Sequence, residues 1–300
     1  PASVETVGWS AFANCPRLKT VSVEAHSRLQ KTGTSSFENC GSLESFVFEG
    51  ACALKTVGNR TFMNDPKLTG FRFPSKVEEI ETGAFNGCKA LVSVTFPADA
   101  VIRKIGKGAF QNALSLPSIT LPASVESIEE SAFNSCQSLV EIKIPATTTS
   151  IDPRAFQFCG KLATFTVDPS NPSYSSVDGF LLSKDKKTLA TFPPAKAGTY
   201  YTLLPPVIEK IGDYAFYYVQ NLENITIPEG VTEIGNYAFD NCNRLNTIAF
   251  LSHTPVPASK IGDKAFNEDN VNKGDIEISV RVDAFEAYKR TILSGMPSTT

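Results

Sequence analysis

A phenylalanine recurs at a nearly constant spacing along this 300-residue chain, and it usually follows a small residue. Eight of the nine intervals between successive copies lie between 23 and 27 residues, and the interval from Phe156 to Phe216 is 60 residues. A period of this length predicts a solenoid, in which each repeat forms one coil that stacks on its neighbours. We call these residues the Phe anchors: Phe12, Phe37, Phe62, Phe85, Phe110, Phe133, Phe156, Phe216, Phe239 and Phe266.

Each repeat has two apolar segments. The first reads L-x-x-h-x-h, where h is apolar, as in Leu91, Val94 and Phe96. Its alternation over β-branched and aromatic residues predicts a strand. The second reads V-x-x-I-G-x-x-A-F, as in residues 231–239. Its glycine predicts a tight turn that needs a positive φ angle, and it recurs at Gly8, Gly58, Gly106, Gly212, Gly235 and Gly262.

Strands that occur once per coil, without hairpin turns, can pair only in parallel, at about 4.8 Å from one another. We therefore expect an α/β repeat solenoid with one parallel β-sheet, in which the apolar strand residues and the Phe anchors share a core. The residues after each anchor, such as 86–88, are expected to form a short helical or irregular turn on the other face.

The two segments together resemble the repeat of the BspA-like, treponemal-type leucine-rich repeat family. The resemblance is carried by LVSVTFP followed by VIRKIGKGAF, and by LENITIP followed by VTEIGNYAF, and it covers about nine-tenths of the chain. It implies the right-handed superhelix of a leucine-rich repeat. It also implies a secreted or lipid-anchored bacterial surface protein, since several members are adhesins for host matrix proteins or other microbes.

We expect a single solenoid over residues 1–300, with regular repeats at 1–167 and 205–270. The sequence PASVETVGWSAF from Pro1 matches PASVESIEESAF from Pro122 at eight of twelve positions, so the chain opens in the middle of a repeat. We therefore expect a trimmed N-terminus, beyond which a signal peptide or lipid anchor would place the protein outside the cell or on its surface.

The long interval and the C-terminal end depart from the repeat. Residues 168–204 contain apolar segments at 180–182 and 189–192 around a polar turn, which predicts a β-hairpin insertion. Residues 271–300 are expected to form a C-terminal cap that covers the last coil, with a helix at Ala284–Leu293.

Composition and motifs exclude several functions. The formal net charge of −3 argues against nucleic acid or an anionic membrane as partner. No apolar run approaches the roughly 18 residues that span a bilayer. The two histidines, His26 and His253, lie at opposite ends of the chain, and no catalytic or phosphate-binding motif occurs. We predict a protein that is not an enzyme and has no cofactor or metal.

Six of the seven cysteines stand three residues after a Phe anchor. This register predicts a stack of buried, reduced side chains. The neighbouring pairs Cys15/Cys40 and Cys136/Cys159 leave disulfides open as an alternative, and no C-x-x-C spacing supports zinc. The six residues are Cys15, Cys40, Cys88, Cys136, Cys159 and Cys242.

Three polar residues of the insertion could ligate calcium or form Asx turns beside prolines, and the turns are the simpler interpretation. These residues are Asp168, Asn171 and Asp178.

The outward positions of the predicted strands are short, polar and rich in hydroxyl groups, with few of the aromatic and arginine anchors of tight interfaces. They are Thr20, Ser22, Ser45, Val47, Gly70, Arg72, Ser93, Thr95, Ser118, Thr120, Glu141, Lys143, Thr164, Thr166, Asn224, Thr226, Thr247 and Ala249.

We predict a monomeric, non-catalytic cell-surface or secreted binding and adhesion protein that presents this face to a protein partner. Tyrosines cluster from Tyr174 to Tyr218, and such partly polar aromatics suit an interface. A carbohydrate-binding accessory protein, which exposed stacked aromatics would favour, and a structural spacer for another domain are the alternatives. The candidate partner-binding residues are Glu141, Lys143, Thr164, Thr166, Tyr174 and Tyr201.

Overall fold

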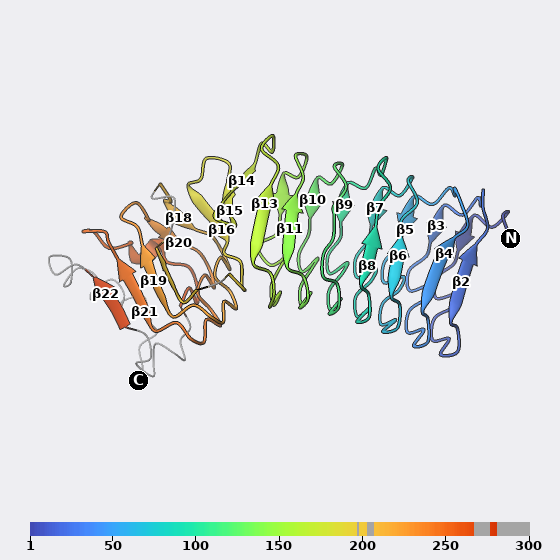
Figure 1. The fold of residues 1–300 in the computed structure, drawn as a ribbon, viewed down its shortest axis with the longest axis horizontal. Helices are drawn as coiled ribbons and strands as arrows, with labels where there is room; N and C mark the ends of the chain where they lie inside the picture. The colour runs from blue at the N-terminus through green and yellow to red at the C-terminus, as the bar shows by residue number, and fades with distance from the viewer. Residues whose placement is uncertain (197, 203–206, 267–276, 281–300) are drawn as a thin grey trace. The chain divides into compact units, whose positions relative to one another are not determined.

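The computed structural model describes residues 1–196, 198–202, 207–266 and 277–280, and most of its strands are labelled in Figure 1. The chain forms two compact units, and each is described by itself. Unit 1 is Pro1–Leu162 with Val167–Ser173, and unit 2 is Ala163–Thr166 with Tyr174–Thr300. That the whole chain forms one solenoid stays a prediction.

Unit 1 is a stack of coils held together by two parallel sheets. The first apolar segments form a four-stranded sheet of β2 (Thr20–Val23), β4 (Ser45–Phe48), β6 (Gly70–Arg72) and β8 (Ser93–Thr95). The second apolar segments form a seven-stranded sheet of β1 (Thr6–Val7), β3 (Lys31–Thr32), β5 (Thr56–Val57), β7 (Glu79–Ile80), β9 (Lys104–Ile105), β10 (Ser127–Ile128) and β12 (Ser150–Ile151). The first apolar segment of a later repeat forms a further strand, β11 (Glu141–Ile144).

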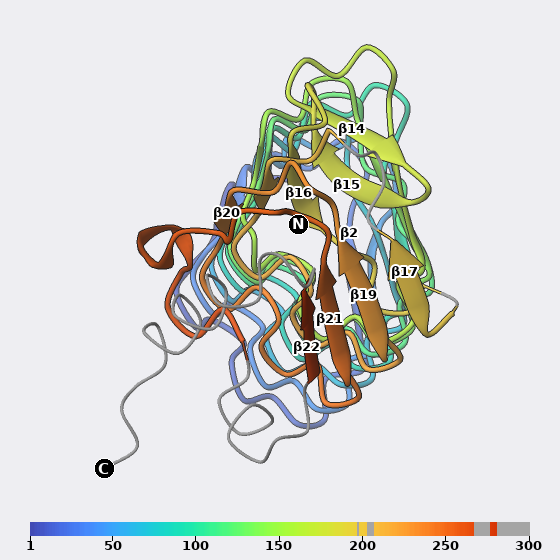
Figure 2. The ribbon, with the colours of Figure 1, turned by 90° about the vertical axis from the view of Figure 1, so that its left-hand side faces the viewer.

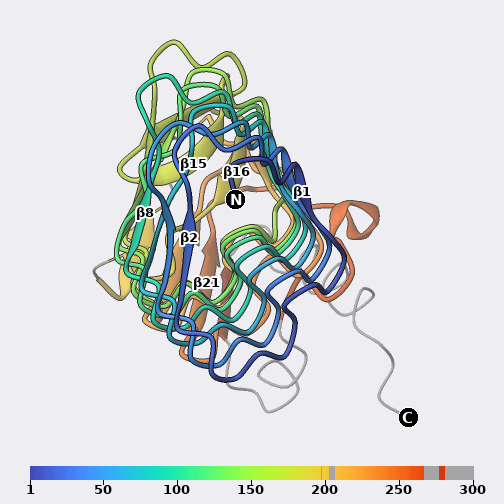
Figure 3. The ribbon, with the colours of Figure 1, turned by 90° about the vertical axis from the view of Figure 1, so that its right-hand side faces the viewer.

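The expectation of one parallel sheet is therefore wrong, because the second apolar segment also forms a strand. Ile80, Ile105 and Ile128 pair in register on successive coils. Two residues are too few to show the alternation by which a strand is recognised in a sequence, so the strands of this sheet could not be predicted. Seen from the N-terminal end, β1 and β2 lie on opposite sides of the first coil, and the coils of unit 1 behind it follow a similar path (Figure 3).

Unit 2 also contains two sheets. One is a parallel sheet of β17 (Tyr200–Thr202), β19 (Asn224–Ile227), β21 (Thr247–Phe250) and β22 (Glu277–Val280), which lie side by side in Figure 2. The other is a mixed sheet of β14 (Tyr174–Val177), β15 (Phe180–Ser183), β16 (Thr188–Thr191), β18 (Lys210–Ile211) and β20 (Glu233–Ile234). The antiparallel pair β15 and β16 is the predicted hairpin, and β14 adds a third antiparallel strand to it.

The hairpin ends in a Phe anchor that the sequence pattern missed. After pairing with β15, β16 pairs in parallel with β18 and so joins the repeat. The N–H of Phe192 donates to the carbonyl oxygen of Ala215 at 2.7 Å, as the N–H of Phe216 does to that of Ala238 at 2.8 Å. The rings of Phe192 and Phe216 lie 4.9 Å apart between centroids. The insertion therefore contains one irregular coil.

The Phe anchors stack along the core of each unit, as predicted. In unit 1 the rings of Phe110, Phe133 and Phe156 follow one another at 5.5 Å, with interplanar angles of 9° and 1°. In unit 2 Phe239 and Phe266 lie 5.5 Å apart at 2°. One coil cannot bury these rings, and the stack buries them from both sides, which is the main source of its stability.

Turns, and not helices, follow the Phe anchors. Within the described residues the helical segment is one 3-10 turn, η1 (Ala258–Lys260), and no helix is long and apolar enough to cross a bilayer. The second residue after an anchor takes a positive φ instead, 56° at Asn14 and 59° at Asn112, which reverses the chain. The expected helical turns are therefore absent from these ranges. The predicted cap with its helix at Ala284–Leu293 lies outside the described residues.

The recurring glycine is required for close approach between coils and not for a positive φ, which none of the six has. A Cβ atom on Gly106 would lie 2.6 Å from the carbonyl oxygen of Ile80 in the preceding coil, and one on Gly58 would lie 2.1 Å from that of Thr32. Both distances are shorter than any real contact. Gly8 in the first coil would meet no atom within 4 Å, so the constraint comes from the preceding coil.

Candidate functional site

The outward strand positions are exposed in unit 1, apart from the half-buried Ser45 and Gly70, and most of them are covered in part in unit 2. Alternation along the strands of unit 1 leaves Thr20, Ser22, Ser93 and Thr95 exposed, as predicted. In unit 2, Thr226 is buried, and the half-buried positions are Asn224, Thr247 and Ala249. The face most open to a partner is therefore that of unit 1.

Glu141 and Lys143 lie on β11 in unit 1, and both are exposed. They alternate with Ile142 and Ile144, which are buried and hold the strand in place. Neither charged side chain forms an ion pair or hydrogen bond with any residue in the described ranges. Both charges are therefore available to a partner.

The predicted site residues Thr164, Thr166 and Tyr174 belong to unit 2. Thr166 is exposed on β13 (Thr164–Val167), and Tyr174 is half-buried at the start of β14. Thr164 is half-buried beneath the turn between β14 and β15, where the N–H of Phe165 donates to the carbonyl oxygen of Gly179 at 2.9 Å. The turn between β14 and β15 therefore covers Thr164 and leaves Thr166 exposed.

Tyr201 is half-buried and contributes to the core of unit 2. Its ring packs edge-on against Phe192, with 5.1 Å between centroids and an interplanar angle of 77°. Burial raises the pKa of its phenol, and the nearby Asp178 carboxylate raises it further. The neighbouring Tyr200 is 65% exposed, and its hydroxyl lies 3.2 Å from that of Thr226. Alternation along β17 would have identified Tyr200 as the outward residue.

The stacking of Tyr214 on Tyr237 in unit 2 was not predicted, because these two residues lie 23 positions apart in the sequence. Tyr214 and Tyr237 stack with 5.0 Å between centroids at an angle of 4°, and Tyr217 packs edge-on against Tyr214 at 5.6 Å. All three are half-buried. Each of the two stacked rings covers one face of the other, so that face is closed to a sugar.

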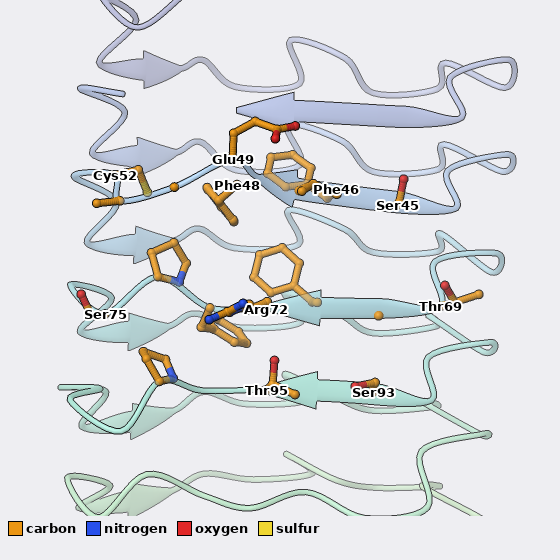
Figure 4. Close-up of a pocket in the computed structure, with 18 of the residues that line it drawn as sticks. Ser45, Phe46, Phe48, Glu49, Cys52, Thr69, Arg72, Ser75, Ser93 and Thr95 are labelled. Carbon is orange, nitrogen blue, oxygen red and sulfur yellow. The ribbon is translucent and has the colours of Figure 1, made fainter. Parts of the chain in front are cut away.

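An open groove of about 720 Å³ crosses β4, β6 and β8 in unit 1 (Figure 4). The groove is deepened at Gly70, which pairs in register with Ser45 on one side and Ser93 on the other and has no side chain to fill the space. Two residues further along β6, Arg72 is exposed. The groove is thus lined by hydroxyl groups, backbone and phenylalanines such as Phe48, with one guanidinium on its central strand.

The groove combines charged and apolar surface. Glu44, Glu49 and Asp99 also line it, and Glu49 accepts a hydrogen bond of 2.6 Å from the hydroxyl of Ser22. Val47 on β4 is 46% exposed. A site of this kind holds a ligand by contacts and charge, and it contains no arrangement of nucleophile and base.

The buried thiols are poor nucleophiles. All seven cysteines are free, and five of the six in register are buried, while Cys15 is half-buried. Burial raises the pKa of Cys159 to about 12 and that of Cys136 well above its ordinary value. Such thiols stay protonated at neutral pH. The interpretation as a buried, reduced stack is confirmed for these five, and the two disulfides left open by the sequence do not form.

Two of the three polar residues of the insertion form Asx turns, and the third, Asp178, pairs with Lys196 at 3.1 Å. Asp168 accepts a hydrogen bond from the N–H of Ser170 at 2.9 Å, and Asn171 accepts one from the N–H of Ser173 at 2.8 Å. The buried amide of Asn171 also donates to the carbonyl oxygen of Pro145 at 2.6 Å. The described residues contain no group of three or more potential metal ligands.

The repeat pattern matches a known family. The model of the BspA type leucine rich repeat region, with six copies, matches residues 1–100, 55–177 and 202–293. The chain belongs to the BspA-type leucine-rich repeat family. The BspA-type repeats therefore include the strands of the unit 1 groove and β11.

Solved structures share this BspA-type fold. A leucine-rich cell surface protein from Faecalibacterium prausnitzii is 24% identical over 95% of this chain and 86% of that chain, with a TM-score of 0.71. The pneumococcal vaccine antigen PcpA is 20% identical over 94% and 72%, with a TM-score of 0.60. A leucine-rich repeat protein from Eubacterium ventriosum is 23% identical over 75% and 61%, with a TM-score of 0.58. No curated protein sequence matches the chain.

Proposed function

We propose that this protein is a monomeric, non-catalytic cell-surface or secreted protein that binds a protein partner through its outward strand face. The observation that carries the proposal is the exposed face of unit 1, on which Arg72, Glu141 and Lys143 make no ion pair with any described residue. Unpaired charges on a rigid sheet are suited to selecting a partner by electrostatic complementarity.

The place of action is part of the proposal. Membership of the BspA-type family supports it, and the Faecalibacterium prausnitzii relative is described as a cell surface protein. An extended repeat surface also suits adhesion, because it gathers many weak contacts along its length.

A protein partner is favoured over a glycan by the aromatic residues. Stacking of a sugar uses free aromatic faces, whereas Tyr214 and Tyr237 cover one face of each other and Tyr201 packs in the core. The exposed strand face offers hydroxyl groups, isolated charges and the apolar Val47 instead. This mixture is typical of protein interfaces of moderate affinity.

The test is a binding screen of the whole chain against matrix proteins, microbial surface proteins and a glycan array. For a protein that binds, Lys143→Glu, Tyr174→Ala and Tyr200→Ala are then compared with Lys89→Glu, an exposed charge reversal in a turn of unit 1. We expect at least one of the first three to weaken binding about tenfold, which is about 1.4 kcal/mol, and the control to leave it unchanged.

Two results would replace this function. Binding to glycans alone would establish the carbohydrate-binding alternative. If nothing in the screen binds, the spacer alternative gains, and the same chain fused between two domains would be expected to hold them at a fixed separation.

A further inference from the structure

Arg72 occupies a special position on the sheet of β2, β4, β6 and β8. The other outward residues of these four strands are small or uncharged, and Arg72 is their one cation. It forms neither an ion pair nor a hydrogen bond with any residue that the structure describes. Neighbouring strands lie about 4.8 Å apart, so a group above β6 lies within reach of β4 and β8 as well.

The space next to Arg72 is open because of Gly70. A Cβ atom on Gly70 would have the carbonyl oxygen of Ser93 as its nearest neighbour at 3.5 Å, which is an ordinary contact. The backbone at Gly70 does not need a glycine for its conformation either, since its φ is not positive. Packing therefore does not require a glycine at this position. The effect of the glycine is to leave a hollow between Ser45 and Ser93.

The charges around the hollow restrict what can enter. Glu44, Glu49 and Asp99 line the same groove as Arg72 and would repel a polyanion such as a nucleic acid or a sulfated polysaccharide. A single carboxylate placed above β6 can reach the guanidinium, which presents two parallel N–H donors to such a group. Neutral or basic groups on either side of it would complement the acidic residues.

The apolar part of the groove indicates the kind of molecule. Val47 is 46% exposed on β4, the strand beside Arg72. A small anion would leave this side chain in water, whereas a peptide can place an aliphatic side chain on it. An opening of about 720 Å³ also accommodates several residues of an extended chain.

We propose that the groove over β4, β6 and β8 binds an extended peptide segment of a partner protein, with one acidic side chain on Arg72 and an aliphatic side chain on Val47. Neutral or basic residues flank the acidic one. This inference rests on the proposed function as a protein-binding surface, and it assigns the place and the chemistry of recognition.

The test is selection of a displayed library of random twelve-residue peptides on the immobilised whole chain. The recovered peptides are expected to be enriched in Asp or Glu near an aliphatic residue. For the strongest peptide, Arg72→Gln and Gly70→Leu should each weaken binding at least tenfold, whereas Lys89→Gln, which removes an exposed cation in a turn of unit 1, should not. Thermal unfolding of each variant is measured to show that it is folded.

A matched peptide completes the test. When its acidic residue is replaced by the corresponding amide, the peptide should bind the wild-type protein about tenfold more weakly. The Arg72→Gln variant should bind the amide peptide and the acidic peptide equally well.

The proposal is overturned if the library yields no binder, if the binders lack acidic residues, or if Arg72→Gln binds them as wild type does. Retention on heparin that depends on Arg72 would also overturn it, in favour of a sulfated glycan. A protein partner from the earlier screen that is insensitive to Arg72→Gln would remove this inference and leave the proposed function standing.

Discussion

The thiol of Cys136 donates a hydrogen bond to the carbonyl oxygen of Phe110, 3.2 Å away in the preceding coil. The same bond joins Cys159 to Phe133 at 3.1 Å, and it recurs at Cys40, Cys88 and Cys242. The cysteine therefore does more than fill space, because its weak donor adds a second hydrogen bond to a carbonyl oxygen that, in Phe110, already accepts one from the N–H of Ala113 at 3.1 Å.

We expect thiol labelling of the native protein to modify Cys15 first. Cys15 is half-buried, whereas the other six cysteines are buried. The thiolate is the form that attacks the reagent, and burial disfavours it. Mass spectrometry after a short exposure to iodoacetamide at pH 8 should show one modified site, and seven after denaturation. Early modification of Cys136 or Cys159, or a mass deficit from a disulfide, would contradict the buried stack.

Asp65 occupies the position that cysteines hold in the neighbouring coils, and its carboxyl group is fully buried. Oδ1 accepts a hydrogen bond of 2.7 Å from the N–H of Cys40, and Oδ2 has no partner among the described residues. The pKa of Asp65 is raised to about 8, mainly by burial and in part by the charge of Glu38, against the lowering effect of the Cys40 hydrogen bond. The folded protein thus holds this proton more tightly than the unfolded chain does.

We predict that Asp65 makes the protein less stable as the pH rises. Its contribution is fully present below about pH 4 and is lost as the pH rises toward 8. Asp65→Asn should remove this dependence, because the amide is neutral at every pH and keeps an acceptor for Cys40. Urea unfolding at pH 5 and pH 8 should show wild type losing about 2–4 kcal/mol relative to the variant.

The exposed Asp99→Asn is the control for this experiment and should not remove the pH dependence that Asp65→Asn removes. If wild type and Asp65→Asn lose stability in parallel between pH 5 and pH 8, Asp65 does not carry the effect.

We expect Phe133→Ala to cost about 3–5 kcal/mol of unfolding free energy, because it leaves a cavity between Phe110 and Phe156. Phe12→Ala is the matched control, since Phe12 is 45% exposed and stacks on Phe37 alone among the Phe anchors. Its cost should be less than about 2 kcal/mol. Urea unfolding of the two variants decides this, and equal costs would mean that the stack is not the main source of stability.

The sequence predicted those parts of the fold that repeat with a strong pattern. The Phe anchors, the strands of the first apolar segment and the hairpin at β15 and β16 were all visible, because burial imposes a period or an alternation on them. The second sheet was not visible, since strands such as Glu79–Ile80 are only two residues long. Phe192 was not recognised as a Phe anchor because its spacing is irregular. It follows Leu189 by three positions, whereas Phe216 follows Ile211 by five.

The candidate site was less predictable than the fold. Alternation correctly placed Arg72 and Lys143 outward, because it reports which side of a strand faces the core. It could not show that Gly70 creates a hollow or that a hairpin covers Thr164, since both depend on neighbours in space. Tyr201 was chosen by residue type, and its place against Phe192 follows from a coil that the sequence did not reveal.

Gly106→Ala should destabilise the protein by more than about 1 kcal/mol. The added Cβ would lie 2.6 Å from the carbonyl oxygen of Ile80 and 2.8 Å from the carbonyl carbon of Glu81, so two coils would have to separate. Gly8→Ala is the control at the same position of the first coil, where a Cβ meets no atom within 4 Å, and it should be neutral or slightly stabilising. Thermal unfolding of both variants measures the difference. Equal effects would show that a conformational need shared by all the repeats, and not contact with the preceding coil, selects this glycine.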